Sequence, residues 1–267
     1  MKSIARILAF LLLAASAGAY AAGGGGDLRL MPAPVSRLDA ESLQRGARNF
    51  INYCLNCHSA KFMRYNRLTD LGIDLSMIED NLMFATDKIG ETMTVAMTAK
   101  DAKAWFGAPP PDLTVEARVR GTDWLYNYLL GFYRDPESVT GWNNIVFPNV
   151  AMPHVGWELS GTNKLVQADF EDHEKATAAA IAAKGLSLVQ AKPGNKWAVL
   201  TVAPDVPGEL TRVQYEAWVA DLVNYLDYMA EPDRNKRISI GIAVLIYLGI
   251  LFAFAYLLKR SYWKDVH

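Results

Sequence analysis

The most constraining feature of the chain is an apolar segment near its C-terminus. Residues 238–258 form a run of 21 residues without one charged side chain. A helix rises about 1.5 Å per residue, so this run is about 31 Å long, which matches the hydrocarbon core of a bilayer. Basic residues flank it on both sides, at Arg234, Lys236, Arg237, Lys259, Arg260 and Lys264. A helix in a soluble core would carry a polar face over this length, so the sequence predicts a transmembrane helix.

The N-terminus predicts export of the chain. Lys2 and Arg6 precede an apolar run at residues 7–18, and Ala19-Tyr20-Ala21 follows it. This is the layout of a secretory signal peptide, and the run is short for a membrane span. A retained N-terminal anchor is the alternative.

Basic residues lie on both sides of the second apolar segment, so the positive-inside rule gives only a weak indication of its orientation. The expected topology therefore follows from the predicted export of the chain. The expected organisation is a signal peptide at 1–22, a periplasmic domain at 23–232, a transmembrane anchor at 238–258 and a cytoplasmic tail at 259–267.

Composition and charge narrow the classes of function. The chain has 27 basic and 28 acidic residues, so no positive excess points to nucleic acid. The net charge is −1 overall, +2 in residues 1–22 and +3 in residues 230–267, which leaves −6 on the body between them. Two interpretations are open: ordinary solvated charge, or an acidic docking face for a basic partner.

The two cysteines of the chain lie in one motif, Cys54-Leu55-Asn56-Cys57-His58. On a helical turn, two such thiols can form thioethers with the vinyl groups of a haem, and the adjacent imidazole can bind the iron. A redox dithiol would call for a thioredoxin-like βαβ setting, and a zinc site would need more ligands at close spacing. The sequence has neither, so it predicts one covalently bound haem c.

Haem iron also needs a sixth ligand or an open position. Met152 is the favoured ligand because it lies in an apolar, proline-braced loop, 94 residues after His58. A thioether raises the reduction potential relative to a second imidazole. His154 is the alternative, whereas His173 lies among charged residues and His267 falls in the predicted tail.

Periodicity predicts the surrounding helices. Residues 36–39 resemble a helix start, and one apolar face then runs into the motif through Leu43, Ala47, Phe50, Ile51 and Cys54. Further helices are expected around Met93 and Met97, which would fill core, from Trp124 to Phe132 with Asp123 as cap, and from Thr211 onward. The face of this last helix is Val219, Leu222, Val223 and Leu226, and it should cross the helix that enters Cys54.

Two connecting regions are less regular. Residues 135–162 read as a long loop. Residues 165–208 contain an alanine-rich helical piece and a hairpin around Trp197–Val202.

Several stretches carry a resemblance to a known family: CLNCHSAKFMRYNRL at 54–68, PPPDLT at 109–114, RVRGTDWLYNYLLGFY at 118–133, WNNIVFPNVAMPHV at 142–155, and YLDYMAEPDRNKR before the anchor. In this order, and with the terminal anchor, the chain resembles the cytochrome c1 family, most of all its proteobacterial forms. Residues 165–208 match less clearly.

The resemblance implies a fold and a set of site residues. The fold would be mostly α, a class I cytochrome c-like haem domain with long loop insertions plus one C-terminal transmembrane helix. Cys54 and Cys57 would bind haem covalently, with His58 and Met152 as axial ligands. Arg120 would meet a haem propionate, with Arg118 as the alternative. The expected pocket-wall residues are Tyr65, Pro110 and Trp124.

The resemblance also implies a function. Such a chain is the electron-transfer subunit of a ubiquinol–cytochrome c reductase, a dimeric inner-membrane complex with cytochrome b and a Rieske iron–sulfur protein, and its acceptor is a cytochrome c. Two alternatives remain open. One is an independent membrane-anchored c-type cytochrome that feeds a terminal oxidase, and the other is a haem sensor with an open iron position.

Overall fold

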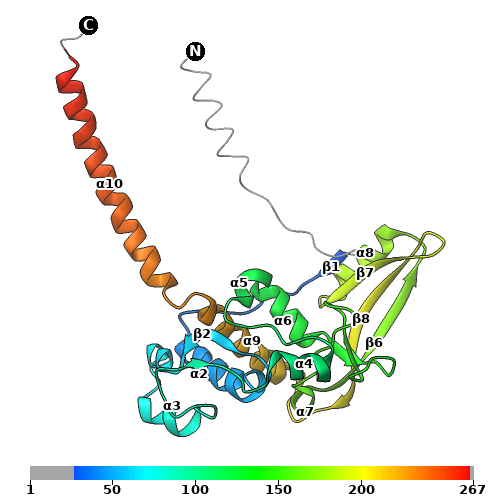
Figure 1. The fold of residues 1–267 in the computed structure, drawn as a ribbon. Helices are drawn as coiled ribbons and strands as arrows, with labels where there is room; N and C mark the ends of the chain where they lie inside the picture. The colour runs from blue at the N-terminus through cyan, green and yellow to red at the C-terminus, as the bar shows by residue number, and fades with distance from the viewer. Residues whose placement is uncertain (1–26, 265–267) are drawn as a thin grey trace. The chain divides into compact units, whose positions relative to one another are not determined.

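The computed structural model describes residues 27–264, so the predicted signal peptide lies outside the described residues. These residues fall into two compact units (Figure 1). The sheet unit comprises residues 27–29 and 167–201, and the helical unit comprises residues 30–166 and 202–264.

The helical unit contains most of the helices in the described part of the chain. They are α2 (Ala40–Asn49), α3 (Leu75–Asn81), α4 (Ala99–Phe106), α5 (Glu116–Arg120), α6 (Thr122–Leu130), α7 (Trp157–Ser160), α9 (Arg212–Ala230) and α10 (Arg234–Tyr262). A π-helical turn η1 (Phe50–Cys54) continues α2, and a 3-10 helix η2 (Tyr65–Leu71) follows β2 (Ala60–Arg64). Two small antiparallel pairs join β2 to β3 (Thr92–Met93) and β4 (Phe132–Arg134) to β5 (Trp142–Asn144).

The start of helix α2 confirms the start expected at residues 36–39. The Asp39 carboxylate accepts a hydrogen bond from the Ser42 backbone N–H, which satisfies a donor of the first turn. The predicted apolar face is buried as far as the motif, because η1 extends the helix without a break. This face supplies the residues Leu43, Ala47, Phe50, Ile51 and Cys54 to the main core.

Helix α9 also begins where the sequence indicates. Thr211 and Gln214 form a reciprocal capping box at its first turn. The predicted face is buried, and α9 packs closely on α2 at Gly46. A Cβ at residue 46 would lie 2.0 Å from the Asp221 carbonyl oxygen, so only glycine allows this approach. Arg37 and Arg45 tie the pair further, through ion pairs of 2.5 Å to Asp227 and 2.6 Å to Asp221.

Two helix predictions are wrong in detail. Met93 lies in β3 instead of a helix, because residues 92–93 pair with β2, and its side chain is fully buried. The nearby helix α4 begins only after its cap, Thr98. Asp123 does not cap α6, since its carboxylate accepts the Ala33 backbone N–H at 2.8 Å. Helix α6 starts at Thr122, and Phe132 belongs to β4 instead.

The sheet unit contains the alanine-rich helix and the hairpin expected in residues 165–208, and it joins them in a sheet that the sequence did not predict. Residues 161–207 form β6 (Gly161–Phe170), α8 (His173–Ala182), β7 (Ser187–Lys192) and β8 (Lys196–Pro207). The sheet order is β1-β7-β8-β6, where β1 is Asp27–Arg29, and β6 and β8 continue into the helical unit. The expected alanine-rich helix is α8, and the expected hairpin is β7–β8, with Ser187 opposite Thr201 and Lys192 opposite Lys196.

A second small core lies in the helical unit around His154. Its ring stacks on Phe132 at 4.9 Å and meets Trp142 edge-on at 5.1 Å. Its Nε2–H donates to Ser160 Oγ at 2.8 Å, and that hydroxyl donates to the Gly161 carbonyl. Burial lowers the pKa of His154 to about 4, so the ring is neutral in the folded protein at neutral pH.

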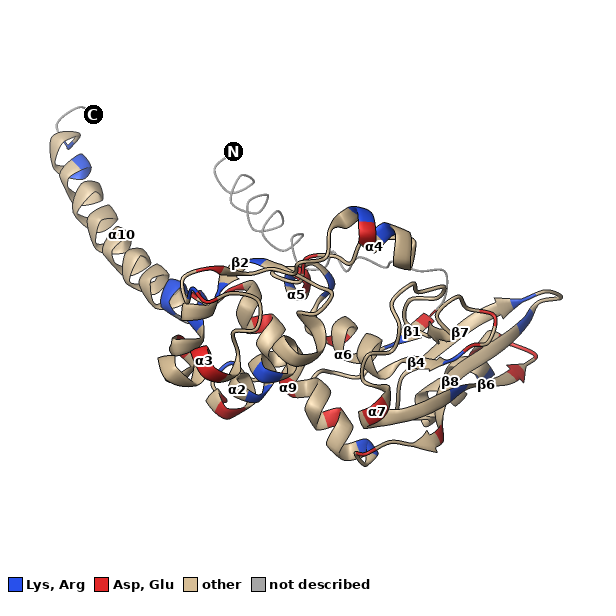
Figure 2. Cartoon of the chain, turned by 60° about the horizontal axis from the view of Figure 1, so that its bottom comes forward, with Lys and Arg blue, Asp and Glu red and all other residues tan. Residues whose placement is uncertain are grey.

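Helix α10 is long and apolar enough to cross a membrane, by length and composition. Its stretch Lys236–Tyr262 contains an 18-residue window with a mean hydropathy of 2.6, and no part of that window is buried within the chain. Figure 2 shows basic residues at both of its ends and none along its middle. Among residues 27–264 it is the one helix with these properties.

Gly46→Ala tests the contact between α2 and α9. Alanine favours a helix by less than about 1 kcal/mol over glycine, but the new methyl group meets backbone and forces the helices apart. We expect a loss of about 1–3 kcal/mol in the free energy of unfolding, measured by thermal melting of the detergent-solubilised protein. Gly90→Ala is the control, because a Cβ there meets nothing within 4 Å. Equal stability of the two variants would contradict the packing argument.

The pH dependence of stability tests the burial of His154. The unfolded chain binds a proton at a histidine near pH 6.5, whereas the folded chain binds it near pH 4. Stability is therefore fully present above about pH 6.5 and falls by about 3 kcal/mol as the pH drops to about 4. His154→Phe keeps an aromatic ring but cannot titrate, so its melting temperature should fall less over this range. An unchanged pH dependence of the melting temperature in His154→Phe would contradict the assignment.

Candidate haem site

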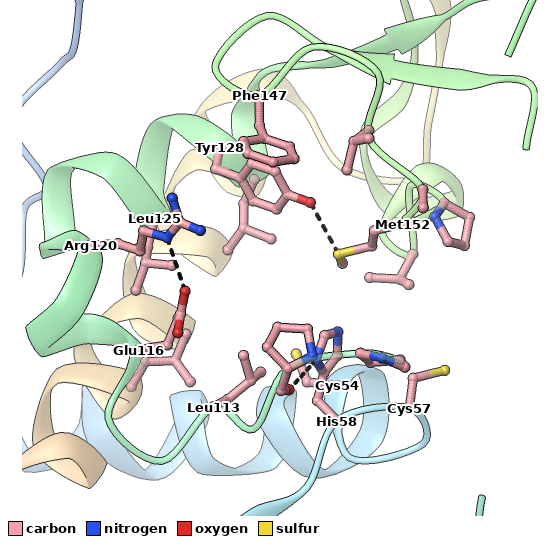
Figure 3. Close-up of a pocket in the computed structure, with 18 of the residues that line it drawn as sticks. Cys54, Cys57, His58, Leu113, Glu116, Arg120, Leu125, Tyr128, Phe147 and Met152 are labelled. Carbon is pink, nitrogen blue, oxygen red and sulfur yellow. Dashed lines mark hydrogen bonds and ion pairs between the residues drawn. The ribbon is translucent and has the colours of Figure 1, made fainter. Parts of the chain in front are cut away.

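One cavity of about 300 Å³ in the helical unit collects most of the predicted site residues (Figure 3). Its walls come from the cysteine motif, the proline-rich loop before α5, helices α5, α6 and α9, and the loop before α7. The predicted residues that line it are Cys54, Cys57, His58, Pro110, Arg120, Trp124 and Met152.

The cysteine motif forms a tight turn at the end of η1. The Cys54 carbonyl accepts the backbone N–H groups of Cys57 at 3.1 Å and His58 at 2.8 Å, which brings all three side chains to one edge of the cavity. Both thiols are free. Burial raises the pKa of Cys54 to about 12 and also raises that of Cys57. A redox dithiol works as a low-pKa thiolate, so these environments argue against that alternative.

The His58 ring is held in one orientation by a hydrogen bond to the backbone. Its Nδ1–H donates to the Pro111 carbonyl oxygen at 2.8 Å, which leaves the lone pair of the neutral ring on Nε2. Burial lowers the pKa of His58 and so favours this neutral form. The sequence did not identify Pro111 as a functional residue, although it lies in the stretch at 109–114 that carries part of the family resemblance.

Met152 lies on the opposite wall from His58 (Figure 3). Two asparagine side chains hold its loop: Asn144 Oδ1 accepts the Val146 N–H at 2.9 Å, and Asn143 Oδ1 accepts the Asn149 N–H at 2.8 Å. The loop is thus rigid without being helix or strand. His154, the alternative ligand, is not among the residues that line the cavity.

The contact between Tyr128 and Met152 was not predicted from the sequence. Its hydroxyl donates to Met152 Sδ at 3.3 Å, as Figure 3 shows. Trp124 stacks on the Tyr128 ring with centroids 4.9 Å apart. The two residues lie four apart in the chain, on one face of α6, so helical spacing alone could have suggested their contact.

Arg120 lies at the edge of the cavity, and Arg118 does not line it. The Arg120 Nε donates to Glu116 at 3.1 Å, and its guanidinium lies 4.7 Å from the centre of the Trp124 ring. The group is partly exposed, with a side-chain exposure of 42%.

Tyr65 does not line the cavity. Its ring is fully buried in the main core, and its hydroxyl has no hydrogen-bond partner in the described part of the chain. Burial also raises its pKa. The family resemblance placed Tyr65 on a pocket wall, whereas in the structure it follows β2 and lies in the main core.

The chemistry of this cavity fits a c-type haem. Two free thiols and a neutral imidazole lie at one edge, and a thioether faces them across a space lined mainly by apolar and aromatic side chains. An arginine at the edge suits the carboxylates that a haem carries. Thiols, imidazole and thioether are the groups by which proteins hold haem iron and its ring.

The chain is similar to curated proteins along almost its whole length. It is 44% identical over 262 residues to the cytochrome c1 of Allochromatium vinosum, which covers 98% of each chain. It is 43% identical over 263 residues to a protein of Nitrosomonas europaea named ammonia monooxygenase gamma subunit, which covers 98% of this chain and 100% of that one. The cytochrome c1 of Rhodospirillum rubrum is 27% identical over 292 residues, 98% of this chain and 97% of that one.

The family profile described as "Cytochrome C1 family" matches residues 31–187 and 209–266. The unmatched stretch between them falls on the β7–β8 hairpin. The chain therefore belongs to the cytochrome c1 family of haem-containing electron carriers.

Proposed function

We propose that this chain is the haem subunit of a ubiquinol–cytochrome c reductase. It would accept electrons from a Rieske iron–sulfur protein and pass them to a cytochrome c. The observation that supports this most is one cavity with the cysteine motif on one wall and Met152 on the other, in a chain of the cytochrome c1 family.

Four residues would hold the haem. Cys54 and Cys57 would bind it through thioethers, and His58 and Met152 would bind its iron. When bound, the haem supplies a one-electron couple at its iron. The Pro111 carbonyl keeps His58 in one orientation, and the asparagine-held loop keeps Met152 in place, so both donors need little rearrangement. Arg120 would contact a propionate and partly neutralise its charge.

The pocket walls would set the electrostatic surroundings. Pro110, Trp124 and Tyr128 line the cavity with apolar or aromatic surface. Such walls exclude water and lower the local dielectric, which raises the cost of the more charged, oxidised state. The residues of this chain thus favour a high reduction potential.

The membrane topology extends the proposal. The predicted signal peptide would export residues 23–232 to the periplasm, and α10 would anchor them in the inner membrane, with residues 259–267 in the cytoplasm. Within a dimeric complex, the apolar surface of α10 would contact lipid and helices of cytochrome b. The acidic balance of the body would favour docking of a basic cytochrome c.

A second function remains a candidate because of one relative. The Nitrosomonas protein named ammonia monooxygenase gamma subunit is about as similar to this chain as the Allochromatium cytochrome c1 is. The name of that protein assigns it to an ammonia monooxygenase, so a role beside such an enzyme is the second candidate function for this chain. An independent carrier that feeds a terminal oxidase is the remaining alternative.

Copurification separates these functions. The tagged chain is extracted from its own membranes in mild detergent, and reduced-minus-oxidised spectra are recorded with ascorbate and then with dithionite. A c-type band with ascorbate followed by b-type bands with dithionite supports the reductase subunit. A c-type band without b-type bands, in an extraction that retains cytochrome b with a tagged Rieske protein, would overturn it.

Met152→Leu tests the sixth ligand. Leucine fills a similar volume without sulfur, so the reduced variant should bind carbon monoxide readily, whereas wild type should not. We expect the equilibrium constant for reduction to fall at least tenfold, which lowers the reduction potential by at least about 59 mV for one electron. Met63→Leu, at a buried methionine of β2, is the control and should match wild type. Exclusion of carbon monoxide by Met152→Leu would rule out Met152.

A further inference from the structure

The contact between Tyr128 and Met152 extends the proposed function, and the inference rests on it. The Tyr128 hydroxyl donates to Met152 Sδ at 3.3 Å. We infer that Tyr128 is a positioning residue that, through this hydrogen bond, raises the reduction potential of the haem and keeps Met152 in place against competing ligands. Tyr128 itself need not contact the iron.

The ring of Tyr128 is held on two sides. Trp124 stacks on it with an interplanar angle of 10°, and Phe132 meets it edge-on at 5.2 Å. The ring therefore has little freedom to turn its hydroxyl away from the sulfur. A tyrosine hydroxyl is a neutral hydrogen-bond donor at neutral pH.

One asparagine couples this ring to the loop that carries the sulfur. Asn144 Nδ2 donates to the Tyr128 backbone carbonyl at 2.7 Å, while Asn144 Oδ1 accepts the N–H groups of Val146 and Phe147. The end of α6 and the start of the Met152 loop thus share one side chain. The distance between the hydroxyl and the sulfur is set by the fold, not by chance contact of two mobile side chains.

The chemistry follows from the two lone pairs of a thioether. One could bind the iron of a bound haem while the other accepts the O–H of Tyr128. The hydrogen bond withdraws electron density from the sulfur, so Met152 would be a weaker donor to oxidised iron. The reduced state would then be favoured, and the reduction potential would be higher.

The hydrogen bond also stabilises the bound position of Met152. An external ligand that displaces the sulfur must break it and leave a buried hydroxyl without a partner. The loss of about one net hydrogen bond corresponds to about a fivefold change in affinity for such a ligand.

Tyr128→Phe in the full-length, haem-loaded protein tests the inference, because it removes the hydroxyl and keeps the ring. In a redox titration we expect the equilibrium constant for reduction to fall about threefold. At 59 mV for each tenfold change, this lowers the reduction potential by about 28 mV. We expect the oxidised variant to bind imidazole about fivefold more tightly, by optical titration. A role in packing alone would move neither value.

Tyr126→Phe is the matched control. Tyr126 lies on the same helix, is buried in the main core and does not line the cavity. Its variant should keep the wild-type potential and imidazole affinity. Haem content and melting temperature of both variants are measured first, so that a folding defect is recognised as such.

The outcomes distinguish this inference from the proposed function. Wild-type potential and imidazole affinity in Tyr128→Phe would overturn the inference and leave the function intact. A change of the same size in Tyr126→Phe would also overturn it, because the effect would not depend on the hydroxyl at the sulfur. Absence of covalent haem from wild type, seen on a haem-stained denaturing gel, would instead overturn the function.

Discussion

Helix α2 can approach helix α9 closely because residue 46 is a glycine, and much of the site depends on that approach. Helix α2 continues into η1, so its position against α9 determines where Cys54 and His58 lie. Helix α9 in turn contributes Leu222 and Leu226 to the cavity. The packing that forms the main core therefore also builds one wall of the site, and a shift of either helix would displace the cysteine motif.

The opposite wall is built by different means. The loop that carries Met152 has no regular structure, and the side chains of Asn143 and Asn144 accept three of its backbone N–H groups, those of Val146, Phe147 and Asn149. Buried amides of this kind make a loop rigid, because each lost hydrogen bond would leave a polar group unpaired. One wall is thus set by helix packing and the other by asparagine side chains, and substitutions can alter one without the other.

The features that the sequence predicted correctly are local. The periodic face that leads into Cys54, the Thr211 cap and the apolar helix α10 each depend on residues a few positions apart. Of the two arginines that the sequence offered, Arg120 is the one that lines the cavity.

The errors concern contacts between distant parts of the chain. Met93 looked helical by its spacing to Met97, but pairing with β2, about 30 residues earlier, makes it a strand residue. Tyr65 follows the motif closely in sequence, yet β2 carries it into the core. The hydrogen bonds of His58 to Pro111 and of Tyr128 to Met152 join residues 53 and 24 positions apart, and nothing in local spacing specifies them.

The central claim is that one iron lies between His58 and Met152. Iron-edge X-ray absorption of the purified, oxidised protein tests it most directly, because sulfur and nitrogen neighbours scatter differently. The account predicts a sulfur neighbour of the iron in wild type that disappears in Met152→Leu. A first shell of nitrogen or oxygen alone in wild type would contradict it.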